Sequence, residues 1–382
     1  MKFSELYSEL RKKLQFDEKK VDLEKVPDDE KKKLLKLCDY HEKVSLYELN
    51  EEGHVIDLAI WPKDQFSLST ILPHLEKLYV YRASAVNLSF LKDYHTLKTL
   101  GLSYCNLDQV PDLSNQPDLE DLNLYYSNIK KIEGLDHLTK LTSLGLAYNK
   151  ITKISGLDKL KTLKNLDLMN NKFSKIEGLK NLVNLEMLSL SENRNLTSFE
   201  GLKGLTKITQ IGLSQCAIES VDGFREFEGF DKLYFLGLSM NRITEIDVKV
   251  TLPALEKLYL SENRITRVNV NGHFPSMTEM ELSENDITKI ETISNLPKLK
   301  YVRLGKNKFD TLENLSNLPS LTNVSIDLTP VKDIKNLDLP NNCLISSFLE
   351  ENFSDDERKE MEQQIKSLGL RDHWVNERYY WD

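Results

Sequence analysis

A short apolar phrase, Leu-x-x-Leu-x-Leu with close substitutes, occurs thirteen times in this chain of 382 residues. The intervals between successive phrases are 20, then 22 five times, then 23 and 25, then 22 four times. A fixed period of this length predicts a stack of like units, each packing mainly on its neighbours. The phrases start at Val55, Leu75, Leu97, Leu119, Leu141, Leu163, Leu185, Ile208, Leu233, Leu255, Met277, Leu299 and Leu321.

The unit that begins at Leu141 shows what each repeat predicts locally. Leu144 and Leu146 alternate with small residues, which is the period of two of a half-buried strand. Apolar residues then recur at every third position from Ile151 to Leu160, which favours a return path of turns and 3₁₀ segments. One such unit cannot close a core alone, but stacked units can.

The ninth position of each phrase is mostly asparagine or cysteine. A buried asparagine is costly unless its amide meets unpaired backbone groups, so we expect a column of amides that bond to the neighbouring turns. Cysteine is small enough to occupy the same buried slot. This column is expected at Cys105, Asn149, Asn171, Asn193, Cys216, Asn241, Asn263, Asn285 and Asn307.

These residues resemble the leucine-rich repeat family, whose pattern is L-x-x-L-x-L-x-x-N/C-x-L. The segments 97–107 and 255–265 match it at every listed position, and the continuation Ile-x-x-Ile-x-Gly-Leu at 129–135 is similar to the 22-residue subclass of the protein phosphatase 1 regulatory subunit and of bacterial internalins. The resemblance covers about residues 55–349. It implies an α/β-type right-handed solenoid with a curved parallel sheet on its concave face.

No linker-like segment interrupts the repeats, so the sequence predicts one elongated body with a cap at each end. We expect an N-terminal helical cap over 1–53, a solenoid of about 13 repeats over 54–349, and a C-terminal helical cap with an aromatic tail over 350–382. Caps are needed because an open stack would expose raw core and a sheet edge.

Local patterns support helices in both caps. Apolar residues follow helical spacing from Phe3 to Leu14, and a second candidate helix follows Pro27. Near the other end, Ser354 and Glu357 form a capping box that predicts a helix start. The tail holds Trp374, Tyr379, Tyr380 and Trp381, which either fold back over the final unit or dock a partner.

Composition and motifs exclude several classes of function. The net charge of −9 disfavours nucleic acid as a partner, and no apolar run is long enough to span a membrane. No signal peptide is apparent and the four cysteines form no clustered pairs, which favours a cytoplasmic location. The seven histidines lack ligand-like spacing and no catalytic motif occurs, so we expect no enzyme, no metal and no cofactor.

Positions three, five and seven of each phrase should point outward on the concave face, with position eight at the strand edge. Tyr104, Tyr126 and Tyr148 share position eight, so they should form a column. Aromatic residues and arginine are enriched at binding hot spots. The candidate partner-binding residues are Trp61, Tyr79, Tyr81, Arg82, Tyr104, Tyr125, Tyr126 and Tyr148, and a possible acidic sub-patch comprises Glu262, Glu279, Glu281 and Glu284.

The expected function is that of a non-catalytic scaffold that binds a partner protein on its concave face. The aromatic residues have a second interpretation, in which they stack across units only to stabilise the sheet. Two alternative functions stay open. One is a regulatory subunit of an enzyme such as a phosphatase, and the other is a fragment of an extracellular receptor or adhesin.

Overall fold

A computed structural model describes Pro27, Asp29, Glu30, Lys33 and residues 41–374, with gaps at 53, 63–64, 67–71, 83–84, 87, 335–336, 342, 348–354 and 368–369. The chain divides into two compact units. Unit 1 comprises Met1–Lys172 and Glu177–Met187, and unit 2 comprises Phe173–Ile176 and Leu188–Asp382. The described part of the chain has no helix long and apolar enough to cross a membrane.

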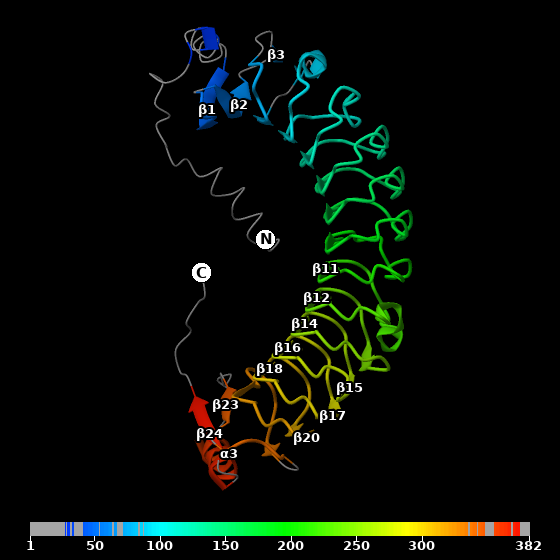
Figure 1. The fold of residues 1–382 in the computed structure, drawn as a ribbon. Helices are drawn as coiled ribbons and strands as arrows, with labels where there is room; N and C mark the ends of the chain where they lie inside the picture. Colours follow the sequence, from blue (N-terminus) through cyan, green and yellow to red (C-terminus); the bar gives the residue numbers. More distant parts are fainter. Residues whose placement is uncertain are drawn as a thin grey trace. The chain divides into compact units, whose positions relative to one another are not determined.

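Every one of the thirteen phrases carries a strand, which confirms the predicted parallel-sheet solenoid. In unit 1 each strand after β2 pairs in parallel with the strand of the preceding phrase, so that Leu100 pairs with Leu78 and Leu122 pairs with Leu100 (Figure 1). In sheet order the strands are β1 (His41–Leu49), β2 (Val55–Pro62), β4 (Lys77–Tyr81), β6 (Thr99–Ser103), β7 (Asp121–Asn123), β8 (Ser143–Gly145) and β9 (Asn165–Asp167).

Unit 2 continues the same pattern, with Leu258 beside Leu236 and Met280 beside Leu258. The strand β10 (Met187–Ser189) spans the residues where the sequence passes from unit 1 to unit 2. In sheet order the strands of unit 2 are β11 (Gln210–Gly212), β12 (Phe235–Gly237), β14 (Lys257–Tyr259), β16 (Glu279–Glu281), β18 (Tyr301–Arg303), β21 (Asn323–Ser325), β23 (Leu344–Ser347) and β24 (Arg371–Trp374).

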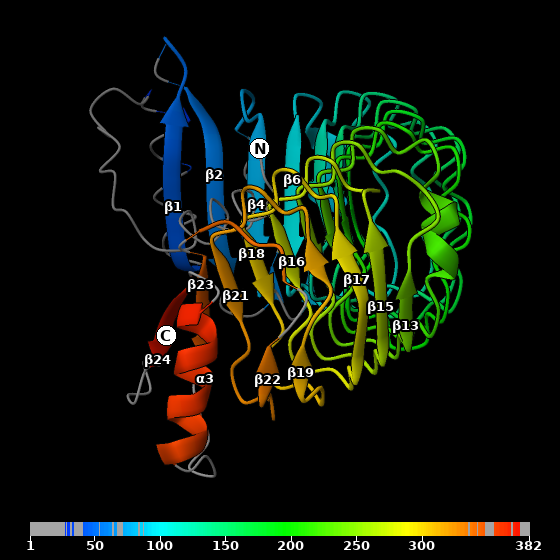
Figure 2. The same cartoon turned by 90° about the horizontal axis from the view of Figure 1, so that it is seen from below.

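The return path of unit 2 forms a second parallel sheet, which the sequence did not predict. Figure 2 shows this layer beside the strands of the first sheet. Its strands are β13 (Glu245–Asp247), β15 (Arg267–Asn271), β17 (Lys289–Ser294) and β20 (Leu315–Ser316). The cause is local, because Val268 and Val270 alternate with polar residues and β-branched side chains favour strands.

Other return segments are short. Strands β3 (Gln65–Phe66) and β5 (Ala85–Val86) pair with each other, as do β19 (Thr311–Leu312) and β22 (Asp333–Ile334). The 3₁₀ segment η1 (Leu88–Asp93) lies in unit 1 and η2 (Asp222–Phe227) in unit 2.

The segment η2 accommodates the extra residues of the unit that starts at Ile208. It buries Phe224 and Phe227 completely, and Phe230 follows it into the core. The Phe227 ring stacks on Phe199 with a centroid separation of 4.9 Å. The insertion in this unit therefore adds apolar core.

The asparagine at position nine joins successive turns. In unit 1 the Asn149 Oδ1 accepts a hydrogen bond from the Ile129 N–H at 3.1 Å, and its Nδ2 donates to the Leu124 carbonyl at 2.9 Å. Asn171 repeats this geometry one unit further on. The Cys105 thiol donates to the Val80 carbonyl at 3.4 Å. In unit 2 burial raises the pKa of the Cys216 thiol to about 12, so it stays a neutral donor, here to the Leu190 carbonyl at 3.4 Å.

The helical caps expected at both ends are not confirmed. In the N-terminal segment, β1 runs antiparallel to β2, with Leu46 opposite Leu58. A strand is favoured here because β2 would otherwise present a row of unpaired backbone groups. Asp29, Glu30 and Lys33 are helical, whereas the helix expected from Phe3 to Leu14 lies outside the described residues.

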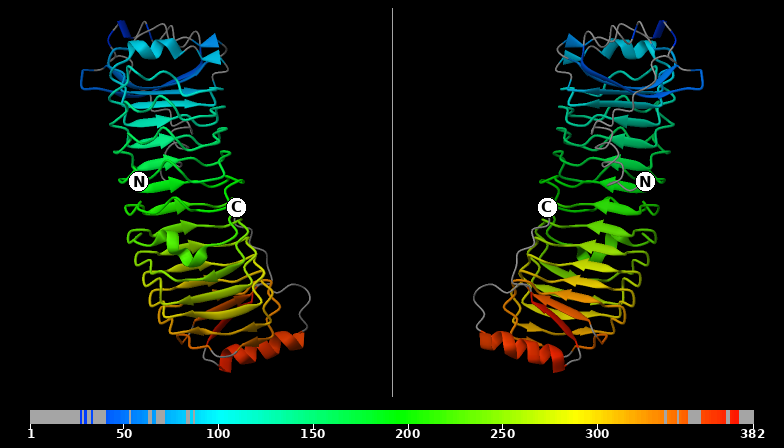
Figure 3. Two further views of the ribbon diagram at one scale, coloured as in Figure 1. Left: turned by 90° about the vertical axis from the view of Figure 1, so that its right-hand side faces the viewer. Right: turned by 90° about the vertical axis from the view of Figure 1, so that its left-hand side faces the viewer.

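The C-terminal segment combines a helix with a strand. Helix α3 (Asp355–Ser367) begins directly after Ser354, buries Ile365, and lies at the C-terminal end of the stack of strands in unit 2 (Figure 3). The Ile334 N–H donates to Gln364 Oε1 at 3.0 Å. Beyond the helix, β24 pairs in parallel with β23, so this segment extends the sheet instead of only covering it. Trp374 belongs to β24, and Tyr379, Tyr380 and Trp381 lie outside the described residues.

Candidate functional site

The sheet has one face made by positions three, five and seven of each strand, with position eight just beyond. We call this the open sheet face. The leucines at positions one, four and six are buried on the opposite side, as at Leu141, Leu144 and Leu146. In unit 1 the open sheet face carries all eight candidate partner-binding residues, from Trp61 in β2 to Tyr148 after β8.

Tyr104, Tyr126 and Tyr148 form a stack, which we call the tyrosine column. Successive ring centroids are 4.2 and 4.1 Å apart, and both interplanar angles are 9°. Tyr104, the first residue of the column in chain order, is 47% exposed. Each residue has a positive φ, between 53° and 59°, and its backbone N–H donates to the next turn, as from Tyr104 to the Tyr125 carbonyl at 2.9 Å. The backbone therefore holds the rings in place.

A second aromatic group comprises Trp61, Tyr79 and Tyr81. Trp61 stacks on Tyr81 with centroids 4.8 Å apart, and the Tyr79 and Tyr81 rings are parallel. Tyr79 lies flat across the next strand, above Gly101. A Cβ atom at Gly101 would lie only 2.7 Å from Tyr79 Cδ1, so a larger residue here would displace the ring. Arg82, at position eight of the same phrase, is exposed.

Tyr125 lies in a similar slot. Its ring covers Gly145, where a Cβ atom would come within 2.6 Å of Tyr125 Cε1. The Tyr125 hydroxyl donates to Asp167 Oδ2 at 2.8 Å, and its backbone N–H donates to Asn123 Oδ1 at 3.1 Å. Gly145, Asp167 and Asn123 were not among the site residues predicted from the sequence. The available signal was a small residue at position five in the unit that follows a tyrosine.

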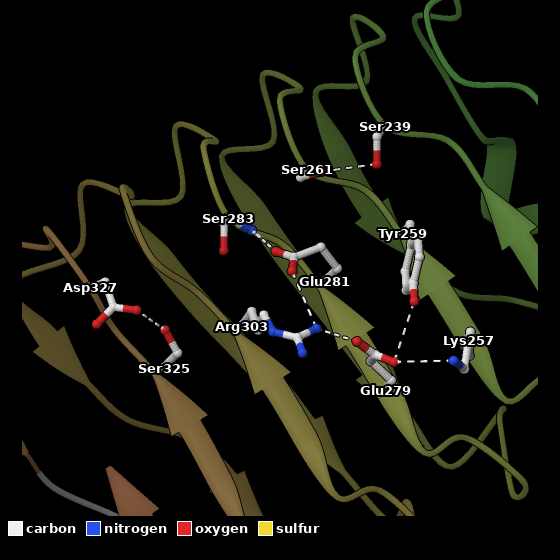
Figure 4. A network of polar contacts seen from close by, with 10 residues as sticks. All are labelled: Ser239, Lys257, Tyr259, Ser261, Glu279, Glu281, Ser283, Arg303, Ser325 and Asp327. Atoms are coloured by element: carbon white, nitrogen blue, oxygen red, sulfur yellow. Dashed lines mark hydrogen bonds and ion pairs between the residues drawn. The ribbon is translucent and has the colours of Figure 1, made fainter. Parts of the chain in front are cut away.

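The acidic sub-patch of unit 2 carries compensating positive charge, as Figure 4 shows. The Arg303 guanidinium donates to Glu279 Oε1 and lies 3.5 Å from Glu281 Oε2. Lys257 Nζ lies 3.6 Å from the Glu279 carboxylate, and the Tyr259 hydroxyl donates to it at 3.4 Å.

The other members of the sub-patch differ in their contacts. Glu281 Oε1 accepts the Ser283 N–H at 2.9 Å, and Glu284 forms an ion pair with Lys306 at 2.7 Å. Glu262 lies at position eight of its phrase with a φ of 54°. Because most of these carboxylates already contact cations, the sub-patch attracts a basic ligand less than the sequence suggests.

These contacts also shift the pKa values of Glu279 and Tyr259. Burial by itself would raise the pKa of Glu279, but the hydrogen bond and charge of Arg303, with the charge of Lys257, hold that pKa below its ordinary value. Burial and the negative charge of Glu279 raise the pKa of Tyr259. At neutral pH the network therefore contains an ionised Glu279 and a neutral Tyr259.

Among the described residues, one group of histidine and carboxylate side chains has ligand atoms close together. It comprises Glu30, His54 and His74, whose ligand atoms all lie within 4.8 Å of one another. No metal site was expected from the sequence, because the seven histidines lack ligand-like spacing; Glu30 and His54 are 24 positions apart, and His54 and His74 are 20 apart.

Comparison with known proteins identifies the class. A family model described as "Leucine rich repeat" matches residues 95–151, and a second, "Leucine Rich repeats (2 copies)", matches residues 139–181. Together with the parallel-sheet solenoid, these matches show that the chain is a leucine-rich repeat protein. A search of curated protein sequences gives no significant match.

Several solved structures share the fold. InlJ from Listeria monocytogenes is 18% identical with a TM-score of 0.52, and the match covers 67% of this chain and 61% of InlJ. YopM from Yersinia enterocolitica is 19% identical with a TM-score of 0.52, covering 75% of this chain and 64% of YopM. TLR13, solved with ssRNA13, is 20% identical with a TM-score of 0.54, and the match covers 78% of this chain and 50% of the TLR13 chain. Similarity at these identities shows the fold alone.

Proposed function

We propose that this protein is a non-catalytic scaffold that binds a partner protein through the open sheet face of unit 1. The observation that carries this proposal is the tyrosine column, whose rings are held in register by the backbone and partly exposed. Tyrosine is enriched at binding hot spots, and a preformed surface lowers the ordering cost of association.

The rest of the open sheet face in unit 1 supports the same function. The Trp61, Tyr79 and Tyr81 group and the Tyr125 ring are fixed by stacking and by the Asp167 hydrogen bond. Rigid aromatic side chains lose little conformational entropy on binding. The scaffold fold is typical of non-enzymatic proteins. Because the net charge is −9, we propose that the partner is a protein and not a nucleic acid. We place this interaction in the cytoplasm as part of the same proposal.

The test compares three variants in affinity capture from the native cell extract, followed by titration of the purified partner. Replacing Tyr104, Tyr126 and Tyr148 with alanine should weaken binding by roughly 100-fold or more, the size of one or two hot spots. Replacing the same residues with phenylalanine keeps the stacked rings and should retain most of the affinity.

The matched control replaces the position-eight residues Glu262, Glu284 and Lys306 of unit 2 with alanine. We expect this variant to capture the same protein as the wild type. If the tyrosine variant is folded by circular dichroism and binds as tightly as the wild type, the aromatic surface is not the site. Loss of binding only in the control would move the site to unit 2. A captured catalytic subunit would support the role of enzyme regulator.

A further inference from the structure

A buried carboxylate and two histidines meet where the N-terminal segment contacts the first turn of the solenoid in unit 1. Glu30 is 1% exposed, and its Oε2 accepts the Val55 N–H at 3.0 Å. Its Oε1 lies 3.0 Å from His54 Nδ1. Burial of a carboxylate is costly unless each oxygen has a partner, and here both oxygens have one.

The second histidine completes the group. The His74 ring stacks on His54 with a centroid separation of 3.9 Å and an interplanar angle of 27°. His74 is exposed, and its ligand nitrogen already lies within 4.8 Å of the ligand atoms of Glu30 and His54. On the opposite edge of the His54 ring, Nε2 lies 3.7 Å from the exposed Glu52 carboxylate.

We propose that Glu30, His54 and His74 bind a zinc ion. Two imidazole nitrogens and one carboxylate oxygen form a common zinc ligand set, in which a water occupies the fourth position. The 3.0 Å between Glu30 Oε1 and His54 Nδ1 suits two neighbouring ligands of one ion. The ion takes the place of the hydrogen bond between these two atoms, and the ring proton of His54 then lies on Nε2.

The surroundings fit this role. When Nδ1 binds the ion, the Nε2–H of His54 points to Glu52, and a carboxylate in that place orients a ligating histidine. The Val55 N–H holds the other oxygen of Glu30. The ion would join the segment around Glu30 to the start of β2 and to the turn before β4. Its binding would therefore stabilise the contact between the N-terminal segment and the solenoid.

The experiment is a calorimetric titration of the full-length protein with zinc chloride, together with thermal unfolding with and without a chelator. We expect one zinc ion per chain and a higher unfolding temperature with zinc than with the chelator. Magnesium chloride should show no binding, because magnesium prefers oxygen ligands.

The decisive variant is His74→Ala, since His74 is exposed and its loss should leave the fold intact. It should weaken zinc binding by about tenfold or more, comparable to the loss of a supporting ligand residue. The matched control is His95→Ala, an exposed histidine in the corresponding turn of the next unit and outside the group. Glu30→Gln should also weaken binding. The proposal is overturned if the wild type binds no zinc, or if His74→Ala binds it as tightly as the wild type.

Discussion

At the eighth position of every repeat except the first, a residue other than glycine adopts a left-handed backbone. The φ angles of Tyr104, Met240 and Glu284 are 59°, 58° and 56°. This conformation costs an L-residue roughly 1–2 kcal/mol. The turn requires it, because the backbone N–H then points at the next turn, as from Met240 to the Ser261 carbonyl at 2.8 Å. The tyrosine column depends on this geometry for its orientation.

The left-handed position leads to a prediction for Met240, which is 42% exposed and has no role in the core. Met240→Asn should raise the free energy of unfolding by about 0.5–1 kcal/mol, because asparagine tolerates this region better. Met240→Val should lower it by about 1 kcal/mol or more, because a β-branched residue tolerates it least. Urea unfolding measures both, with Met240→Leu as the neutral control. A valine variant as stable as the wild type would contradict the argument.

The second prediction at the residue scale concerns pH. The pKa of Glu279 is lower in the folded than in the unfolded state, so its stabilising effect is present above the unfolded pKa and lost as pH falls through the folded pKa. Arg303→Met should reduce the free energy of unfolding by about 1 kcal/mol at pH 7, since the guanidinium is partly solvated. The effect should shrink toward zero as Glu279 becomes protonated.

Chemical denaturation from pH 7 to pH 3 checks this dependence. Arg264→Met, which replaces an exposed arginine in the turn after β14, two units earlier, is the control and should cost little at any pH. An equal loss for Arg303→Met at both ends of the pH range would show that packing, and not charge, is responsible.

At the scale of elements, strands were predictable and return paths were not. The alternation of leucines predicted the thirteen strands that the phrases carry, because one face of each strand must be buried, whereas β1, β23 and β24 of the same sheet did not follow from it. The return path of unit 2 forms the sheet of β13, β15, β17 and β20, although triplet spacing favoured turns. Triplet spacing and the alternation of a strand can bury the same residues, so spacing alone does not distinguish a path of turns from a strand. In unit 2 the β-branched residues favour the strand.

The segment η2 gives a prediction at this scale. Phe227→Ala should lower the free energy of unfolding by about 3–5 kcal/mol, because it removes a fully buried ring and leaves a cavity between Phe199, Phe224 and Phe230. Phe235→Ala, on the half-exposed face of β12, should cost clearly less. Thermal and urea unfolding measure the difference. Equal losses would mean that η2 is not part of the core.

At the scale of the whole molecule, a stack of repeats must protect its terminal strands. The edge of β2 is covered by β1, and β24 adds a strand beyond β23. An uncovered edge offers unpaired N–H and C=O groups to another chain. Terminal elements therefore affect solubility as well as stability.

Two truncations test this role of β1. Deletion of residues 1–40 retains β1, and deletion of residues 1–50 removes it. We expect the longer deletion to self-associate through the exposed edge of β2, relative to the shorter one. Sedimentation velocity at several protein concentrations measures the difference. If both truncated chains sediment alike, β1 does not protect the edge.

The sequence by itself determined the repeat, the positions of the thirteen strands that the phrases carry and the buried leucines. It also predicted which tyrosines share position eight. All of these follow from the period, because residues at equal positions in successive units must lie side by side.

Only the tertiary structure decided the contacts that break this period. Tyr125 reaches Asp167, Arg303 reaches Glu279, and Glu30 meets His54 and His74. Their sequence separations follow neither the repeat nor any motif. Such pairs depend on the direction in which each side chain leaves its strand or turn, and on which neighbouring residue is small enough to make room. That information is set by packing in three dimensions and not by spacing along the chain.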